Sequence, residues 1–218
     1  MISSPSNNKH PEHARDVLQF ERKYSEQGCK YIAGLDEAGR GALAGPVVAA
    51  AVVLYPEQFI PGVNDSKQLA PLKRIKLYRL IKQSALATAV GLVENTRIDS
   101  INILEATRLA MTRALKKLPQ IPDCLLLDAL TIPGLEVFQV PIVSGDNLSH
   151  SIAAASILAK VVRDRIMVSW HARYPQYNWI KNKGYGTVEH LAAIHDYGPS
   201  PIHRTTFRGV IQYPGLFD

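Results

Sequence analysis

The sequence of 218 residues has little cysteine and no long apolar run. Its two cysteines, Cys29 and Cys124, form no spacing typical of a metal site, so we expect ordinary reduced thiols. No apolar stretch approaches the roughly 20 residues that a membrane-spanning helix needs, and we therefore expect no membrane association. Residues 1–15 are polar and lack the apolar middle of a secretory signal, which predicts a disordered tail on a cytoplasmic protein.

The composition suits one soluble globular domain, because 46% of the residues are hydrophobic and 20% are charged. The sequence contains no internal repeat and no long low-complexity tract. The 25 lysines and arginines exceed the 19 acidic residues and give a formal net charge of +6. This excess favours a polyanionic partner such as nucleic acid.

Apolar periodicity and turn residues predict an alternation of strands and helices. Strands are expected at 31–36, 46–54, 88–94, 124–128 and 136–144. Helices are expected at 16–27, 71–84, 99–118, 147–172 and 187–197, the last within an otherwise turn-rich tail. A hairpin, a third strand and then helices alternating with strands imply an α/β fold, with a mixed sheet flanked by helices.

Four acids stand at or near the ends of these elements. Asp36 and Glu37 close the first strand, Asp128 closes the fourth, and Asp146 precedes the long helix. Functional groups gather where strands end in such sheets, so these carboxylates are candidates for one site. Close carboxylates repel one another unless a divalent cation compensates them, and oxygen-only ligands suit Mg²⁺ or Mn²⁺. Two such ions can activate water in phosphodiester hydrolysis.

Each acid also has a structural interpretation. A single Asp at a strand end is more often a turn or cap residue, and Asp146 taken alone resembles a helix N-cap. Adjacent strand residues point to opposite faces, so Asp36 and Glu37 cannot both point inward from a regular strand. Either the strand breaks there, or Glu37 acts partly through its backbone carbonyl. Asp128 is harder to explain structurally, because no turn residues flank it.

The other polar markers carry weaker signals. Gly39 and Gly41 permit close backbone approach to a ligand or a simple hairpin turn, and Arg40 between them suits a phosphate. Lys67 suits either a phosphate contact or a solvated loop. Tyr185, between glycines and close to two lysines, suits either stacking on a sugar or base or anchoring of its loop.

Three histidines are given no functional role. His190, His195 and His203 stand in sequence that resembles a surface helix and loop.

Seven segments resemble the bacterial ribonuclease HII family in content and in order. They are YIAGLDEAGRGALAGPVVAAAVVL, NDSKQL, IDSINILEATRLAM, LLLDAL, SGDNLSHSIAAASILAKVVRDRIM, NKGYGT and YGPSPIHR. The resemblance runs from about Tyr31 to Phe207. It implies an RNase H-like domain over 16–172 and a C-terminal helical and loop extension over 173–218, packed on that domain.

The resemblance also implies an activity and roles for individual residues. The activity is cleavage of RNA in RNA–DNA hybrids and incision 5′ to single ribonucleotides in duplex DNA. The catalytic and metal-binding acids correspond to Asp36, Glu37, Asp128 and Asp146. The residues that contact substrate correspond to Gly39, Arg40, Gly41, Lys67 and Tyr185. The cofactor would be Mg²⁺ or Mn²⁺, and the enzyme is expected to act as a monomer.

The sequence departs from the family pattern at four places. Ala42 replaces a proline, Ala129 a glycine after the third acid, and Ser144 a lysine. The segment 206–210 reads TFRGV where SFAPV is common. None of these changes removes an acid or the Gly-Arg-Gly motif.

Alternative functions remain open at this level. A type 1 ribonuclease H or a Holliday-junction resolvase would share the fold, and a non-catalytic nucleic-acid-binding module would share the fold without the chemistry. The end of the chain, 212–218, loosely resembles a tail that binds a sliding clamp, with Gln212, Leu216 and Phe217 as anchors. A disordered or simply packed terminus is the alternative.

Overall fold

The computed structural model describes residues 16–55, 57–64 and 66–210. The expectations for residues 1–15 and 212–218 lie outside these ranges. Within them, no helix is both long and apolar enough to cross a membrane.

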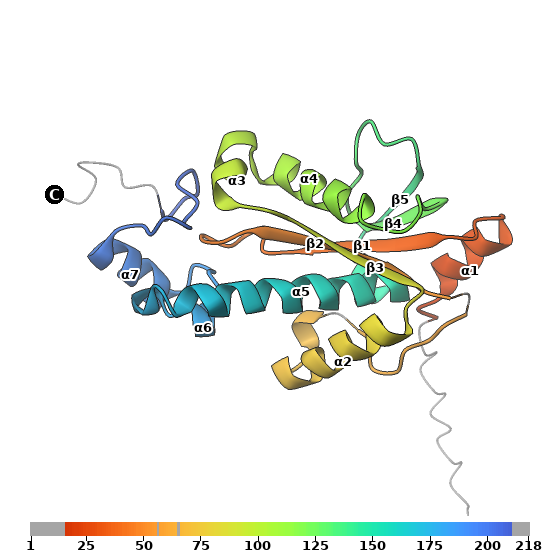
Figure 1. Cartoon of the computed structure of the whole chain (residues 1–218), viewed down its shortest axis with the longest axis horizontal. Helices are drawn as coiled ribbons and strands as arrows, with labels where there is room; N and C mark the ends of the chain where they lie inside the picture. Colours follow the sequence, from red (N-terminus) through yellow and green to blue (C-terminus); the bar gives the residue numbers. More distant parts are fainter. Residues whose placement is uncertain (1–15, 56, 65, 211–218) are drawn as a thin grey trace, which may run out of the picture.

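A five-stranded mixed sheet forms the centre of the structure (Figure 1). Its strands lie in the order β3-β2-β1-β4-β5, and the first three in this order are joined antiparallel, β1 to β2 and β2 to β3. The pairs β1–β4 and β4–β5 are parallel. The bounds are β1 Ile32–Ala38, β2 Val47–Val53, β3 Ala87–Val93, β4 Cys124–Asp128 and β5 Phe138–Ile142. The mixed α/β sheet that the sequence predicts is therefore confirmed.

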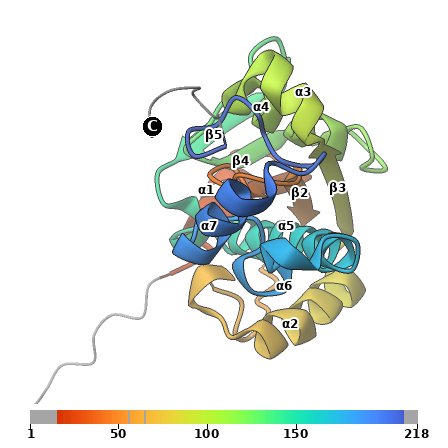
Figure 2. The same cartoon turned by 90° about the vertical axis from the view of Figure 1, so that its left-hand side faces the viewer.

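Helices cover both faces of the sheet (Figures 1 and 2). Helix α4 (Ile103–Leu115) packs on one face, preceded by α3 (Asn95–Ile101). On the other face the long α5 (His150–His171) packs against β1 and β2, and α2 (Pro71–Ser84) packs on α5. Gly34 of β1 permits the close approach of α5, because a Cβ there would overlap the backbone of Ser151.

The single helix expected over 99–118 is wrong. Helices α3 and α4 are separated by Asn102, which has a left-handed φ of +67°. The Asn102 side chain accepts hydrogen bonds from the backbone N–H groups of Leu104 and Glu105 and so caps α4. Asparagine tolerates the left-handed region better than most residues, which allows the break without glycine or proline.

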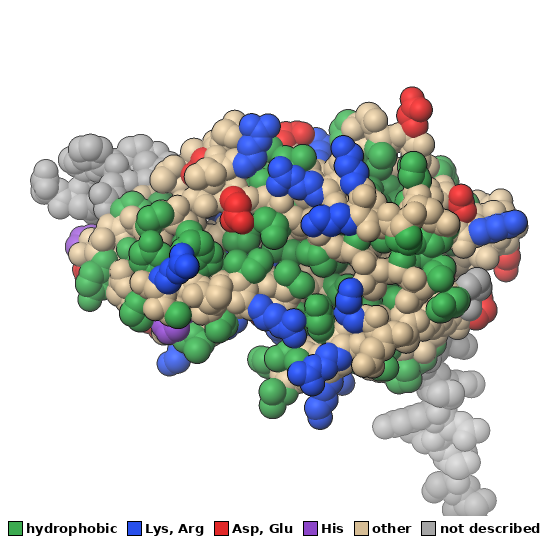
Figure 3. Space-filling model, in the orientation of Figure 1, with side chains coloured by type: hydrophobic (Ala, Val, Ile, Leu, Met, Phe, Trp, Pro, Cys, Tyr) green, Lys and Arg blue, Asp and Glu red, His purple; other side chains and the backbone are tan. Residues whose placement is uncertain are grey.

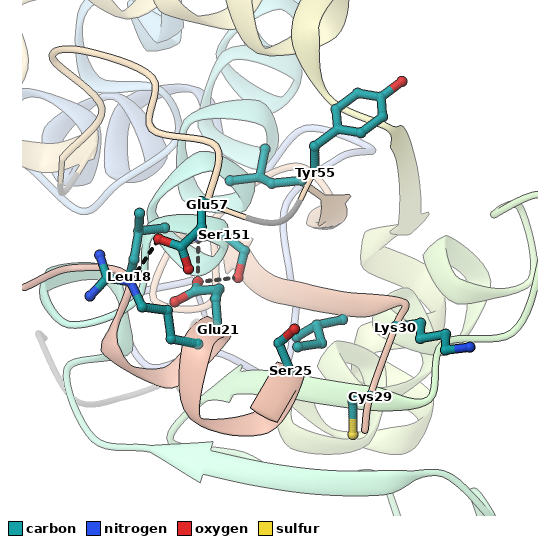
Figure 4. Close-up of a pocket in the computed structure, with 11 residues that line it drawn as sticks. Leu18, Glu21, Ser25, Cys29, Lys30, Tyr55, Glu57 and Ser151 are labelled. Carbon is teal, nitrogen blue, oxygen red and sulfur yellow. Dashed lines mark hydrogen bonds and ion pairs between the residues drawn. The ribbon is translucent and has the colours of Figure 1, made fainter. Parts of the chain in front are cut away.

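Helix α1 (Gln19–Glu26) anchors the start of α5 (Figure 4). The Glu21 carboxylate accepts hydrogen bonds from the Ser151 backbone N–H at 2.9 Å and from the hydroxyls of Ser149 and Ser151, each at 2.7 Å. An anion at a helix N-terminus is favourable because the first N–H groups have no helical partner. The pocket in Figure 4 is therefore a structural junction between α1 and α5.

Basic side chains cover the open edge of the sheet. Strand β3 is an edge strand, and its outward carbonyls would otherwise be free to pair with another chain. Arg113 of α4 donates to the carbonyl of Leu92 at 2.7 Å, and Lys117 donates to the carbonyl of Val90 at 2.8 Å. On the face seen in Figure 3, lysine and arginine side chains spread over the middle, and most of the acidic side chains lie toward the rim.

The C-terminal segment packs at the end of α5, where Figure 2 shows α6 and α7 together. It contains α6 (Trp179–Asn182), where no helix was expected, and α7 (Val188–Tyr197). Trp179 and Tyr177 are buried against Met167 of α5. A bridge between Ala44 and His203 joins this segment to the loop between β1 and β2.

Two of the three histidines lie inside this segment. His190 and His203 are 0% and 1% exposed, and their Nε2 atoms lie 3.0 Å apart. The expectation that they lie on the surface is wrong, whereas His195 is exposed. Pairing with Trp179 and Ser200 lets both rings stay neutral in the interior.

Candidate active site

The first two acids lie where β1 runs past the end of its neighbour β4. The pairing of these parallel strands ends at Leu35 opposite Leu127. Strand β1 nevertheless continues through Asp36 and Glu37, which pair with β2 on the other side. A break of the strand at these acids, one of the two alternatives left open by the sequence, is therefore excluded. The edge of β1 facing β4 is open at this point, because β4 ends at Asp128.

A cleft of about 500 Å³ opens at this edge, a volume within the range of ligand sites. It brings together three of the four predicted acids and all five predicted substrate-contacting residues. The lining residues are Asp36, Glu37, Ala38, Gly39, Arg40, Gly41, Ser66, Lys67, Arg74, Asp128, Ser156, Lys160 and Tyr185. Asp146 does not line the cleft but contacts Lys67, which does.

Asp36 is the most deeply buried acid of the cleft, at 4% exposure. Burial raises the pKa of its carboxyl well above the usual value, and the nearby charges of Glu37 and Asp128 raise it further. Its hydrogen-bond donors are the backbone N–H of Glu37 at 2.7 Å and the hydroxyl of Ser156, both neutral. Asp36 therefore lacks a compensating positive charge among its described hydrogen-bond partners.

Glu37 reaches the same cleft from the opposite face of the strand. Its carboxylate Oε1 accepts from the Arg40 guanidinium at 3.3 Å, whereas Oε2 is buried with no hydrogen-bond partner in the described part of the chain. Burial raises the pKa of Glu37, and the charge of Arg40 offsets part of that rise. Strand β4 ends at Asp128, one residue past Leu127, the partner of Leu35, so Glu37 has no neighbouring strand on that side. This explains how neighbours in a regular strand line one cleft.

Asp128 ends β4 and faces the turn that precedes α5. Its Oδ1 accepts from the backbone N–H of Gly145 at 2.8 Å. The next residue, Ala129, has a left-handed φ of +52°, a conformation that costs roughly 1–2 kcal/mol for residues other than glycine. This is the position at which the ribonuclease HII pattern usually has glycine. The strained turn directs the chain away from the sheet immediately after the acid.

Asp146 lies in a short 3-10 helix, Gly145–Asn147, and is 4% exposed. It does not cap α5, because the N-cap is Ser149, whose hydroxyl accepts from the backbone N–H of Ile152. The capping interpretation of Asp146 is therefore wrong. Its carboxylate contacts the ammonium of Lys67 at 3.4 Å and the side-chain amide of Asn147 at 3.0 Å.

The acids have the donor chemistry of a hard divalent cation. All are oxygen ligands, the buried Asp36 lacks a cationic hydrogen-bond partner, and one Glu37 oxygen is unsatisfied. Within the described residues, however, no three Asp, Glu, His or Cys side chains are already arranged around one point. Asp128 turns toward Gly145 and Asp146 toward Lys67, so these two would have to reorient to close such a site.

Several lining residues were not anticipated from the sequence. Arg74 of α2 is 8% exposed, and it donates to the backbone carbonyls of Ser66 and Leu69 on either side of Lys67. Lys160 of α5 lies 5.5 Å from the centre of the Tyr185 ring. Ser156 and Lys160 are four residues apart and therefore share one face of α5. That spacing could have indicated from the sequence that Ser156 and Lys160 lie together, whereas no local pattern identifies Arg74 as a residue of the cleft.

Comparison with known proteins identifies the family. The family model described as Ribonuclease HII matches residues 33–210. A relative described as Ribonuclease HII, from Caldanaerobacter subterraneus subsp. tengcongensis, is 55% identical over 188 residues, which are 86% of this chain and 78% of the relative.

Solved structures agree with this assignment. The ribonuclease H2 of Pyrococcus horikoshii OT3 is similar with a TM-score of 0.68 and 29% identity, over 83% of this chain and 95% of that one. RNase HII of Archaeoglobus fulgidus, solved in a complex with PCNA, is similar with a TM-score of 0.67 and 25% identity, over 84% and 97% of the two chains. The RNase H-like fold implied by the sequence is thus confirmed, and the chain belongs to the ribonuclease HII family of type 2 ribonucleases H.

Proposed function

We propose that this enzyme cleaves the RNA strand of RNA–DNA hybrids and incises duplex DNA on the 5′ side of a single embedded ribonucleotide. One observation carries the proposal: a cluster of acids and an exposed glycine backbone line the same cleft. The acids suit phosphodiester hydrolysis, and backbone donors and acceptors suit the 2′-hydroxyl that distinguishes RNA from DNA.

Asp36, Glu37, Asp128 and Asp146 are proposed to hold Mg²⁺ or Mn²⁺. A bound divalent ion lowers the pKa of a water ligand and offsets the charge of the phosphate and of the acids. In-line attack of water on the scissile phosphorus would form one P–O bond as the bond to the 3′-oxygen breaks, and protonation of that oxygen would leave 5′-phosphate and 3′-hydroxyl ends. The contact between Lys67 and Asp146 would exchange for a contact between Lys67 and a phosphate.

The residues around the acids are proposed to recognise the substrate. Arg40 is exposed and Lys67 is 75% exposed, so both can meet phosphates of the backbone. Gly41 has open space at its Cβ position and leaves room for a ribose to approach the main chain of the Gly-Arg-Gly motif, whereas the Cβ position of Gly39 is filled by Arg163. The Tyr185 ring, held 5.2 Å from the Arg163 guanidinium, offers a face for the sugar or base of the junction.

The proposal is tested with three duplexes: all-DNA, DNA with one ribonucleotide, and DNA with a run of ribonucleotides. With Mg²⁺ or Mn²⁺ present, we expect a cut on the 5′ side of the single ribonucleotide and none in the all-DNA duplex. Cleavage confined to the run would assign a specificity like that of a type 1 ribonuclease H. Cleavage of a four-way junction alone would assign a resolvase. Either result would overturn the proposal.

We also propose a sliding-clamp contact through residues 212–218. The support is the sequence QYPGLFD and the complex of the Archaeoglobus fulgidus relative with PCNA. Deletion of 212–218 should abolish retention on an immobilised bacterial clamp and leave cleavage of short duplexes unchanged. Equal retention of the full chain and the deletion variant would contradict the proposal.

A further inference from the structure

The loop after β1 is held from inside by a buried arginine. Arg204 is 0% exposed, yet within the described residues it forms no ion pair with a carboxylate. Its guanidinium donates to three backbone carbonyls of the loop: Gly39 at 2.7 Å, Arg40 at 2.8 Å, and Gly45 at 3.0 and 3.1 Å. Burying a charge is costly unless it is hydrogen-bonded, so these bonds fix the position of the loop strongly.

A second buried arginine holds the other end of the same loop. Arg163 of α5 is 0% exposed and donates to the carbonyls of Ala44 at 3.0 Å, Pro46 at 3.1 Å and Lys183 at 2.8 Å. Its side chain also packs directly under Gly39, where a Cβ would overlap it. The two arginines therefore restrain the loop at both ends, and Arg204 restrains the end that carries the Gly-Arg-Gly motif.

The inward carbonyls determine where the neighbouring amides point. In a trans peptide, the C=O of one residue and the N–H of the next point in opposite directions. Because the carbonyls of Gly39 and Arg40 point at Arg204, the amides of Arg40 and Gly41 point away from it. Neither amide donates to another group in the part of the chain that the structure describes. Arg40 and Gly41 are exposed and line the cleft.

We propose that Arg204 is a positioning residue for ribonucleotide recognition: it turns the Gly39 and Arg40 carbonyls inward so that the Arg40 and Gly41 amides face the substrate ribose. This inference rests on the function proposed above. A lysine cannot substitute, because its ammonium is a point charge that does not span three carbonyls, whereas the planar guanidinium has five N–H donors. The Arg204 guanidinium bonds to backbone carbonyls of the loop and to none of the four acids, so its effect is on selectivity.

The experiment measures binding, so that catalysis does not enter. In an Asp128→Asn background with Mg²⁺, the affinity for a duplex with one ribonucleotide is divided by the affinity for the same duplex in all-DNA form. Arg204→Lys should lower this ratio by about tenfold, the loss expected when one to two hydrogen bonds are misplaced. Affinity for all-DNA duplex should change little, because Arg40 and Lys67 remain.

Two further variants separate positioning from a general loss of structure. Ile194→Ala removes a buried side chain of the same C-terminal core that makes no hydrogen bond to the loop, and it should lower thermal stability without lowering the ratio. Arg204→Gly leaves space for a free guanidinium ion, and millimolar guanidinium should restore the ratio in this variant alone. This rescue also supplies the test if Arg204→Lys folds poorly.

The outcomes distinguish this inference from the one on which it rests. If the Asp128→Asn parent itself binds both duplexes equally, the proposed ribonucleotide specificity fails. If the parent prefers the ribonucleotide and a folded Arg204→Lys variant keeps the same ratio, the positioning role of Arg204 is overturned. A fall in the ratio for Ile194→Ala equal to that for Arg204→Lys would overturn it as well.

Discussion

Two neighbouring parts of the cleft differ in how fully their polar groups are satisfied. The loop from Gly39 to Pro46 has its carbonyls bound by two buried arginines, including contacts of 2.7 to 3.1 Å from Arg204. The acids beside it have an unsatisfied oxygen on Glu37 and a buried carboxyl on Asp36 close to two others. The loop therefore has its inward carbonyls satisfied and the outward amides of Arg40 and Gly41 left for a ligand, whereas the acids keep an unsatisfied oxygen and an uncompensated buried carboxyl.

The difference indicates which part is preorganised and which part awaits a ligand. A recognition surface must hold its shape before the substrate arrives, because ordering it on binding costs affinity. A cation site can instead be completed by the ion, which removes the repulsion between the acids. The restrained loop therefore fits the proposed role in recognising the ribonucleotide. The incompletely compensated acids fit the proposed role in binding the cation.

Removal of one acid should produce the largest effect. We expect Asp128→Asn to lower the cleavage rate on the order of 10³-fold, since it removes a charge at the reacting phosphate. The variant should remain folded, because the asparagine oxygen can still accept from the Gly145 backbone N–H. Mg²⁺ at ten times its dissociation constant should stabilise the wild-type protein by about 1.4 kcal/mol, and the variant by less. A variant with full rate would contradict the site assignment.

The same substitution should affect mainly stability at one glycine of the motif and mainly cleavage at the other. Gly39 has φ +94° and lies against Arg163, so Gly39→Ala should destabilise the fold by about 3 kcal/mol. Gly41 has open space around its Cβ position, so Gly41→Ala should change stability by less than about 0.5 kcal/mol. Its methyl group would nevertheless obstruct the ribose and slow cleavage about tenfold. Urea unfolding and cleavage kinetics on both variants measure this contrast.

Acid should destabilise the C-terminal core. Burial and the neighbouring His190 together lower the pKa of His203 to about 4, against about 6.5 in an unfolded chain. Between these values the unfolded chain binds more protons, so stability falls as pH falls from about 6.5 to 4, by up to about 3 kcal/mol. The raised pKa values of Asp36 and Glu37 act oppositely, because there the folded chain binds protons first.

Urea unfolding at pH 7 and pH 5 measures this dependence. His203→Asn should flatten it, since it removes the group that takes up the proton. Asp36→Asn should steepen it, since it removes an opposing contribution. Identical slopes in all three proteins would show that these buried groups do not govern the pH dependence.

The smallest effect is expected at the strained turn after Asp128. Ala129 has φ +52°, and Ala129→Gly should stabilise the fold by about 0.5 kcal/mol, the relief of strain being partly offset by the entropy of glycine in the unfolded chain. Cleavage should be unchanged. Destabilisation in thermal unfolding would mean that the Ala129 methyl group contributes packing that exceeds the strain.

Local sequence was sufficient for most of the fold. The apolar runs of β2 and β4 and the alternation of strands and helices predicted a mixed sheet, and helix α2 begins at Pro71 and ends at Ser84 as expected. Periodicity could not reveal the break at Asn102, because the apolar spacing continues through it. The positive φ there is visible only in the folded backbone.

The sequence by itself determined which functional groups are present: the acids near the strand ends, the Gly-Arg-Gly motif and the excess of positive charge. These features are local, because they depend on residue type and spacing along the chain. Only the tertiary structure decided that Asp36 and Glu37 share a cleft, since this depends on β4 ending before β1 does. It also decided that Arg204 holds a loop 159 to 165 residues away, a contact between segments that no local pattern connects.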